Sequence, residues 1–226
     1  DEVKAVILTG RGRAFCVGHD MKEQPERRAE SDRRSSAVPT MGDYPPLHLQ
    51  LLPKPIIGAI NGLVTGGGLA MALLCDVRIA STQARFSEMH VSIGTIPGAE
   101  TWLLPRAVGL SNAARLIFTG QWVDADEASR LGLVSQVVEP DRLMPAAREM
   151  ATQIARMPLA ALTYAKRALY HGLGTDLAAS LEHVSYSRTL LRSMGVSGAA
   201  RRTGRERPGD SDTTAAQTSL PMGTSM

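Results

Sequence analysis

The sequence predicts an α/β fold built around a largely parallel β-sheet, and three observations lead to this prediction. The chain has 226 residues, 43% of them hydrophobic, which is enough for one sizeable core. Short apolar runs rich in β-branched residues indicate buried strands. These runs alternate with longer helical segments, as in proteins whose parallel strands are joined by helices. A single α/β domain is therefore the default expectation.

The predicted strands are short apolar runs that end at turn residues. The first closes at Gly10, and the second leads into Asn61-Gly62, so each ends at a residue that favours a turn. We expect strands over residues 3–9, 55–60, 77–80 and 134–138.

The predicted helices are placed by their end signals. Asp124 and Glu127 have the spacing of a capping box, and Ser111 can cap a helix that ends near Gly120. The last predicted helix carries an apolar stripe, which requires a packing partner. Further helices are expected over residues 69–74, 142–155, 158–171 and 176–192.

Composition excludes several classes of protein. The formal charge is only +3, and no Lys/Arg stripe is interleaved with the few aromatic residues, so a nucleic-acid surface is not expected. No apolar run has the length of a membrane span, and no signal peptide opens the chain. Cys16 and Cys75 cannot build a disulfide framework and have no partner at metal-ligand spacing. These features predict a cytoplasmic protein without membrane or metal.

The chain divides into three predicted parts. Residues 1–140 form the α/β core, residues 141–195 form a C-terminal helical region, and residues 196–226 form a disordered tail rich in Gly, Ser, Thr and Arg. Within the core, residues 22–46 are charged and interrupted by prolines, which predicts a mobile surface loop.

Gly66-Gly67-Gly68 lies between a predicted strand and a predicted helix. Free backbone N–H groups at such a turn can hold an anion or an oxyanion. The turn lacks the Gly-Lys-Ser/Thr of a Walker loop and the spacing of a dinucleotide-binding fold. Taken alone, a glycine triplet more often reflects tight packing between helix and strand.

A second turn gives the triplet a more specific meaning. Residues 14–22 (AFCVGHDMK), together with residues 61–68 (NGLVTGGG), resemble the paired signature of the enoyl-CoA hydratase/isomerase (crotonase) family. The resemblance covers roughly residues 1–191 and implies a crotonase-like spiral of β-β-α units with a helical C-terminal trimerisation region. It continues through residues 75–81, 86–88, 94–99, 104–106 and 131–134.

The resemblance implies an acyl-CoA site. In that family, two backbone N–H groups form an oxyanion hole around the thioester carbonyl, and motif matching places them at His19 and Gly67. Val17 and Lys22 match positions that bind coenzyme A, although a solvated surface lysine is an equally simple interpretation of Lys22. Coenzyme A would enter as part of the acyl-CoA substrate, with no separate cofactor. The family also implies a homotrimer or a hexamer.

The chain departs from the family pattern where proton transfer occurs. Family hydratases hold the attacking water between two glutamates, and the matching residues here are Ala70 and His90. Alanine cannot move a proton, and general acid–base catalysis contributes on the order of 10²–10⁴-fold, so ordinary hydration should be severely impaired. An imidazole, whose ordinary pKa is about 6.5, suits the single base of an isomerase. Glu100 is the second candidate acid or a plain helix-start residue, and Glu88 is expected to be structural.

Three functions remain open at this point. The first is an acyl-CoA enzyme in which His90 or Glu100 moves the proton. The missing glutamates favour a catalytically silent acyl-CoA-binding protein, and the histidine-plus-acid combination favours a hydrolase of carbon–carbon or thioester bonds. The remaining histidines with no ligand partners are expected to be structural, namely His48, His171 and His183.

Both ends differ from the family pattern. The hairpin and helix that precede the first strand in relatives are expected to be missing, and the residues after Met194 do not resemble the usual C-terminal segment. A fragment and an altered reading frame are the two alternatives. Either one would expose apolar surface along the sheet and along the helix over residues 176–192.

Overall fold

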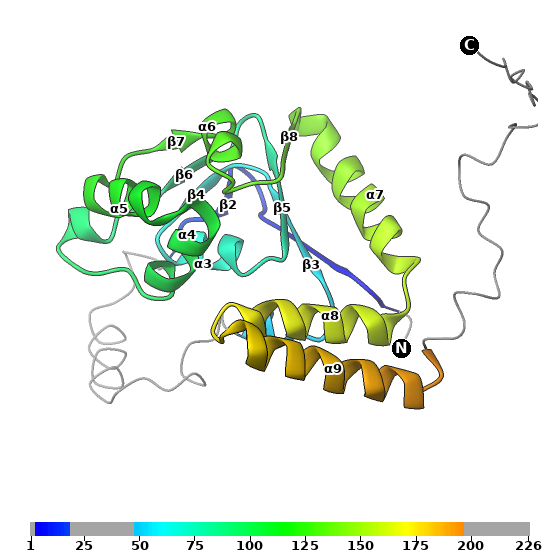
Figure 1. Ribbon diagram of the computed structural model, residues 1–226. Helices are drawn as coiled ribbons and strands as arrows, with labels where there is room; N and C mark the ends of the chain where they lie inside the picture. The colour runs from blue at the N-terminus through cyan, green and yellow to red at the C-terminus, as the bar shows by residue number, and fades with distance from the viewer. Residues whose placement is uncertain (1–2, 19–47, 197–226) are drawn as a thin grey trace, which may run out of the picture.

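The fold is described by a computed structural model for residues 3–18 and 48–196 (Figure 1). The first of its two sheets is parallel throughout, with the strand order β1-β3-β5-β8. All five residues of β3 are buried, because neighbouring strands cover both of its edges and helices cover the sheet. The four strands predicted from apolar runs form this sheet, as β1 (Val6–Thr9), β3 (Ile56–Ile60), β5 (Val77–Ser81) and β8 (Gln136–Val138).

The second sheet is built from strands of two or three residues in the order β2-β4-β6-β7. β2, β4 and β6 are parallel, whereas β7 runs antiparallel to β6. β1, β3 and β5 of the first sheet are each followed along the chain by a short strand of the second sheet, as in the predicted spiral of β-β-α units. The strands are β2 (Ala14–Cys16), β4 (Leu63–Thr65), β6 (Arg85–Ser87) and β7 (Val123–Asp124).

Helices cover the sheets on both sides. The larger core cluster joins the second sheet to α3–α6, and a smaller one packs Leu143 and Ala147 of α7 onto Ile57 and Ile79. These helices are α3 (Gly67–Leu73), α4 (Glu100–Val108), α5 (Leu110–Thr119), α6 (Ala125–Arg130) and α7 (Leu143–Ala155). Shorter segments are α2 (His48–Leu51) and the 3₁₀ turns η3 (Val91–Ile93) and η4 (Pro140–Arg142).

The predicted helix ends are largely found. The Asp124 side chain accepts the Glu127 N–H at 2.8 Å, so the expected cap of α6 is present. Gly120 ends α5 in the left-handed conformation, as glycine commonly does. The start of α5 differs, since Gly109 occupies the N-cap position and Ser111 lies inside the helix.

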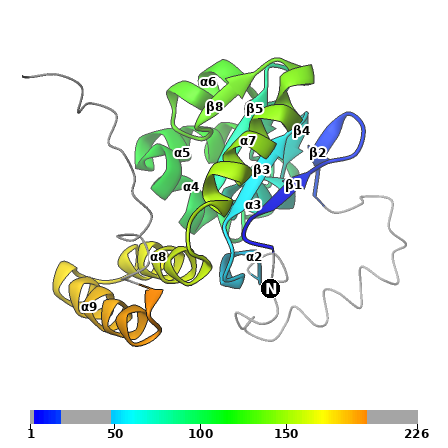
Figure 2. The same cartoon turned by 90° about the vertical axis from the view of Figure 1, so that its right-hand side faces the viewer.

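The last two helices form a hairpin that stands apart from the sheets (Figures 1 and 2). α8 (Leu159–Gly172) and α9 (Leu177–Ser193) pack mainly on each other. The apolar stripe predicted for the last helix is therefore not buried within the described chain, since Leu177 is 75% exposed. Other exposed apolar side chains of the hairpin are Leu169, Leu173, Leu181 and Tyr186.

Two predictions concern residues that the structure does not describe. The predicted loop over residues 22–46 lies outside the described residues, as does the predicted tail from residue 197 onward. Within the described ranges, every helix is too short or too polar to span a lipid bilayer.

Candidate functional site

The two glycine turns come together where β2 and β4 end. These neighbouring parallel strands carry the chain to Gly18 and to Gly66, and both glycines have positive φ angles, 84° and 53°. A methyl group on Gly18 would lie 3.3 Å from the backbone nitrogen of Gly67. The residue that precedes His19 therefore lies directly against the Gly67 amide.

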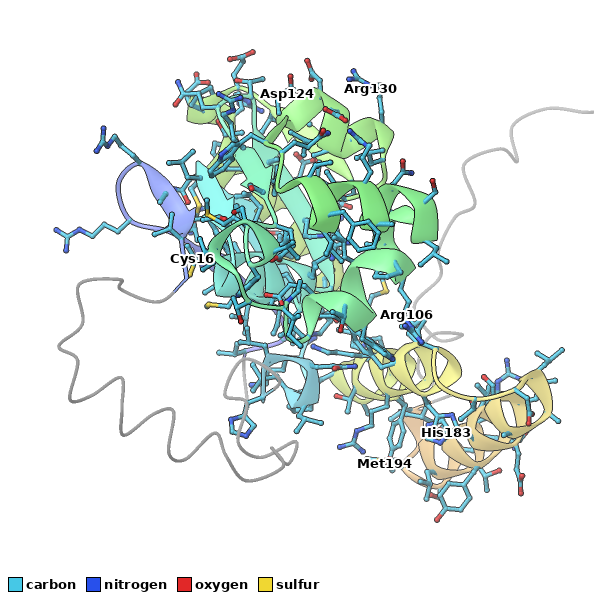
Figure 3. The ribbon with its side chains drawn as sticks, turned by 90° about the vertical axis from the view of Figure 1, so that its left-hand side faces the viewer. Cys16, Arg106, Asp124, Arg130, His183 and Met194 are labelled. Carbon is cyan, nitrogen blue, oxygen red and sulfur yellow. The ribbon has the colours of Figure 1, made fainter. Side chains whose placement is uncertain are left out.

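The glycines of the triplet have different roles. A methyl group on Gly68 would lie 2.0 Å from the carbonyl oxygen of Cys16, so Gly68 allows α3 to pack on β2. Figure 3 labels Cys16 at this edge of the sheet. A methyl group on Gly67 would have Gly18 Cα as its nearest neighbour, at 3.9 Å. Packing thus explains Gly68, whereas among the described residues a methyl group on Gly67 would meet no more than an ordinary van der Waals contact.

Half of the predicted acyl-CoA site lies outside the described residues. His19, the second predicted oxyanion donor, and Lys22, the predicted phosphate contact, both fall there. Val17 is described, just after β2, and its side chain is exposed. The pairing of His19 with Gly67 therefore stays a prediction, although the position of Gly18 is compatible with it.

Ala70 and His90 both follow the glycine turn in the chain, Ala70 within α3 and His90 after β6. Ala70 is fully buried in α3, where its methyl group offers no proton-transferring atom. His90 follows β6 and precedes η3, with its side chain 23% exposed. A methyl group on Gly66 would lie 3.6 Å from His90 Cε1 and 3.9 Å from its Nε2. The structure therefore brings the imidazole edge to the turn that carries Gly67.

The other ring nitrogen of His90 is held by Glu88. The Nδ1 of His90 contacts Glu88 Oε1, and the main-chain N–H of His90 donates to the same oxygen at 3.2 Å. The Glu88 side chain is completely buried, and its Oε2 has no hydrogen-bond partner among the described residues.

Glu100 is the first residue of α4, and it faces the same group. It is 1% exposed, and neither carboxyl oxygen has a hydrogen-bond partner in the described part of the chain. Burial raises the pKa of the Glu100 carboxyl, and the neighbouring Glu88 carboxylate raises it further. The amides of Gly98 and Glu100 offset part of this rise without reaching hydrogen-bond geometry. Glu100 is therefore a helix-start residue that also lies close to Glu88 and His90.

One atom from each of Glu88, His90 and Glu100 lies within 4.8 Å of the other two. Carboxylates and imidazole are also metal-ligand types, but the imidazole of His90 and the Glu88 carboxylate are in direct hydrogen-bond contact. Two ligands of one ion stand about 3 Å or more apart, because each is about 2 Å from the metal. His90 Nδ1 and Glu88 Oε1 are therefore a hydrogen-bonded pair and not two ligands of one ion.

A second polar group, which the sequence did not single out, lies beneath a separate cavity. Asp76 Oδ2 accepts from Ile56 N at 2.7 Å and from Lys166 Nζ at 2.8 Å, and Oδ1 accepts from Tyr170 OH at 2.7 Å. The cavity of about 230 Å³ lies between α4 and α8, where Figure 3 labels Arg106. Its lining includes neither the glycine turn nor His90.

The cysteine and histidine predictions can also be compared with the structure. Burial raises the pKa of the Cys75 thiol to about 12, which makes it an unreactive core residue. His171 and His183 stack between α8 and α9, with ring centroids 4.3 Å apart, which agrees with a structural role. Figure 3 labels His183 on the helical hairpin.

Comparison with known proteins shows to which family the chain is related. The family model described as enoyl-CoA hydratase/isomerase matches residues 1–196. The short-chain-enoyl-CoA hydratase of Clostridium acetobutylicum is 42% identical, over 80% of this chain and 69% of its own length. The (E)-benzylidenesuccinyl-CoA hydratase of Thauera aromatica is 40% identical, over 84% and 72%. The crystal structure of an enoyl-CoA hydratase from Bacillus anthracis has a TM-score of 0.73 at 37% identity, over 82% of this chain and 72% of that one. The chain therefore belongs to the enoyl-CoA hydratase/isomerase family.

Proposed function

We propose that this chain binds an acyl-CoA thioester and catalyses a reaction through its enolate, with His90 as the base that replaces the usual pair of glutamates. The observation that carries the proposal is the edge of the His90 ring lying beside the glycine turn at Gly66. A base there is adjacent to the Gly67 amide, which would face the thioester oxygen. Double-bond migration is the reaction that fits a single base.

The proposed mechanism is a stepwise proton transfer. His90 Nε2 takes a proton from the α-carbon, and the electron pair of that C–H bond forms the enolate. The amides of Gly67 and His19 would stabilise the enolate oxygen, and each such donor typically contributes about 10²–10³-fold in rate. Delivery of a proton to the γ-carbon completes the migration of the double bond, either by return of the same proton from His90 or from a protonated Glu100, which His90 then reprotonates.

Isotope exchange tests this proposal. The wild-type protein in D₂O should exchange the α-protons of butyryl-CoA and convert 3-enoyl-CoA to 2-enoyl-CoA, followed by mass spectrometry and absorbance. His90→Ala should slow both by about 10²–10⁴-fold, because it removes the base, and should leave acyl-CoA binding unchanged in calorimetry. His48→Ala is the matched control, since His48 is exposed in α2. Equal rates in His90→Ala and wild type would contradict the proposal.

Ala70 favours a second candidate, a protein that binds acyl-CoA without transforming it. Its buried methyl group occupies the position of a family glutamate and can neither donate nor accept a proton. Tight binding of butyryl-CoA without α-proton exchange would support this candidate. Release of free coenzyme A thiol in the same assay would instead identify a hydrolase.

We further propose that the chain assembles through its helical hairpin as a trimer or a dimer of trimers. The exposed leucines of α8 and α9 support this, because apolar surface of this kind is commonly covered by a partner. Analytical ultracentrifugation measures the oligomeric state, and replacement of Leu177 and Leu181 by serine should shift it toward monomer.

The two free cysteines support a reducing, cytoplasmic location.

A further inference from the structure

The sequence favours a structural role for Glu88, but its contacts indicate a more specific one. The same oxygen, Oε1, accepts the main-chain N–H of His90 and contacts the Nδ1 of its ring. The carboxylate therefore bridges the backbone and the side chain of a single residue. This fixes the orientation of the ring relative to its own backbone, and the position of His90 between β6 and η3 fixes the backbone.

The contact also determines which ring nitrogen carries the proton. An ionised carboxylate only accepts hydrogen bonds, so the Nδ1 beside it must be the protonated nitrogen of the neutral ring. The lone pair is then on Nε2, at the edge of the ring that lies beside Gly66. The Nε2 of His90 can act as a base in this tautomer and not in the other.

A purely structural carboxylate would have partners for both of its oxygens. Glu88 Oε2 has none among the described residues, and the same is true of both oxygens of Glu100 nearby. Two carboxyl groups buried this close together do not both stay ionised at low cost, so one of them holds a proton. Glu100 is the one surrounded by the fewest favourable contacts, which leaves Glu88 as the carboxylate.

We propose that Glu88 is a positioning residue that holds His90 with Nε2 toward the glycine turn and balances the positive charge the ring gains when it takes a proton. The proposal rests on the enolate chemistry proposed above. When the α-carbon loses its proton to Nε2, its electron pair moves to the thioester oxygen, and the imidazolium formed is stabilised by the Glu88 carboxylate. When the proton returns to carbon, the ring returns to its neutral Nδ1–H tautomer.

The tautomer can be measured without any substrate. In ¹⁵N-labelled wild-type protein, NMR should show His90 with Nδ1 protonated and Nε2 unprotonated at neutral pH. Glu88→Met keeps the length of the side chain but replaces the carboxylate acceptor by an apolar group, so the ring should change to the Nε2–H form. A wild-type His90 with Nε2 protonated would overturn the proposal, even if the Met variant does not fold.

Kinetics test the charge of Glu88 separately from its shape. Glu88→Gln should lower the kcat of α-proton exchange about 100-fold and change KM less than about twofold. The reason is that the carboxylate stabilises the imidazolium that forms during proton transfer and not the bound substrate. Glu127→Gln is the matched control, since Glu127 is a half-exposed carboxylate paired with Arg115 on the surface, and it should leave the rate unchanged.

The outcomes separate the two proposals. If the acyl-CoA chemistry is wrong, the wild type shows no exchange, yet the NMR tautomer still decides whether Glu88 positions His90. A Glu88→Gln variant with the wild-type rate would overturn the positioning role. So would a wild-type rate that is abolished by EDTA and restored by Zn²⁺, because the three groups would then act as metal ligands.

Discussion

Two carboxylate groups of this protein, one around the partly buried Asp76 and one around the buried Glu88 and Glu100, have opposite surroundings. Both oxygens of Asp76 have partners, which are a backbone amide, the Lys166 ammonium and the Tyr170 hydroxyl. Glu100 is at least as deeply buried, but neither of its oxygens has a partner in the described chain. The charge of Asp76 is therefore balanced by its partners, whereas Glu100 has no such partner and can bind a proton.

The difference indicates what each group is for. Native proteins pair nearly all of their buried polar atoms, because an unpaired one costs free energy. The Asp76 group follows this rule and ties α8 to the start of β5, so its role is structural. The Glu88–His90–Glu100 group departs from this rule, because three of its four carboxyl oxygens have no partner among the described residues. Its histidine side chain is 23% exposed. Such departures concentrate at sites where a proton or a ligand completes the arrangement.

The largest expected effect comes from breaking the satisfied group. Asp76→Ala leaves the Lys166 ammonium, whose side chain is 5% exposed, without its carboxylate. Removing one partner of a buried ion pair typically costs roughly 3–5 kcal/mol, because the remaining charge stays desolvated. The free energy of unfolding should fall by this amount in urea denaturation.

The surface pair of Arg115 and Glu127 is the control for this measurement. Its side chains are 37% and 29% exposed, so Glu127→Gln should cost no more than about 0.5 kcal/mol. If Asp76→Ala cost as little as this control, the Asp76 group would not hold α8 in place, and the contrast between the two carboxylate groups would fail.

A smaller effect is expected from removing one hydrogen bond of the same group. Tyr170→Phe deletes the hydroxyl that donates to Asp76 and keeps the ring. Burial raises the pKa of Tyr170, with a further rise from Asp76, so the phenol remains a donor at all ordinary pH values. A hydrogen bond to a charged group contributes about 1.5 kcal/mol or more, and the variant should lose about that much.

A double-mutant cycle sharpens this second measurement. In the Asp76→Ala background the tyrosine hydroxyl has lost its acceptor, so Tyr170→Phe should then cost close to nothing. Equal costs in the two backgrounds would mean that the loss does not come from the hydrogen bond to Asp76.

The fold was only partly predictable from the sequence. The strands of the first sheet were predicted because they are apolar runs rich in β-branched residues, and the capping box of α6 was predicted because its two residues are three positions apart. The strands of the second sheet contain two or three residues each, which is too few to show a period. α4 contains Pro105, which ordinarily signals the end of a helix.

The same limit applies to the site. Motif matching predicted roles for Gly67, Ala70 and His90, because those positions lie in continuous stretches of family pattern. It could not show that Glu88 holds His90, since that contact depends on the turn after β6. The partners of Asp76 are 90 and 94 positions away in the chain, where only the packing of α8 could reveal them.

The smallest expected effect is at Glu100, because a single bound proton already removes most of the cost of its burial. Its pKa is raised in the folded chain above the ordinary value of 4.5, mainly by desolvation. Above that pH the folded state therefore holds more protons than the unfolded state, and stability falls as pH rises until the folded pKa is passed.

Glu100→Gln imitates the protonated carboxyl, so its stability has no such dependence on pH at this position. The variant should match the wild type below about pH 4.5 and become the more stable of the two as pH rises, in urea denaturation from pH 4 to 8.5. If the variant instead became less stable than the wild type as pH rises, Glu100 would be ionised and paired in the fold, as Asp76 is. The distinction between the two groups would then be lost.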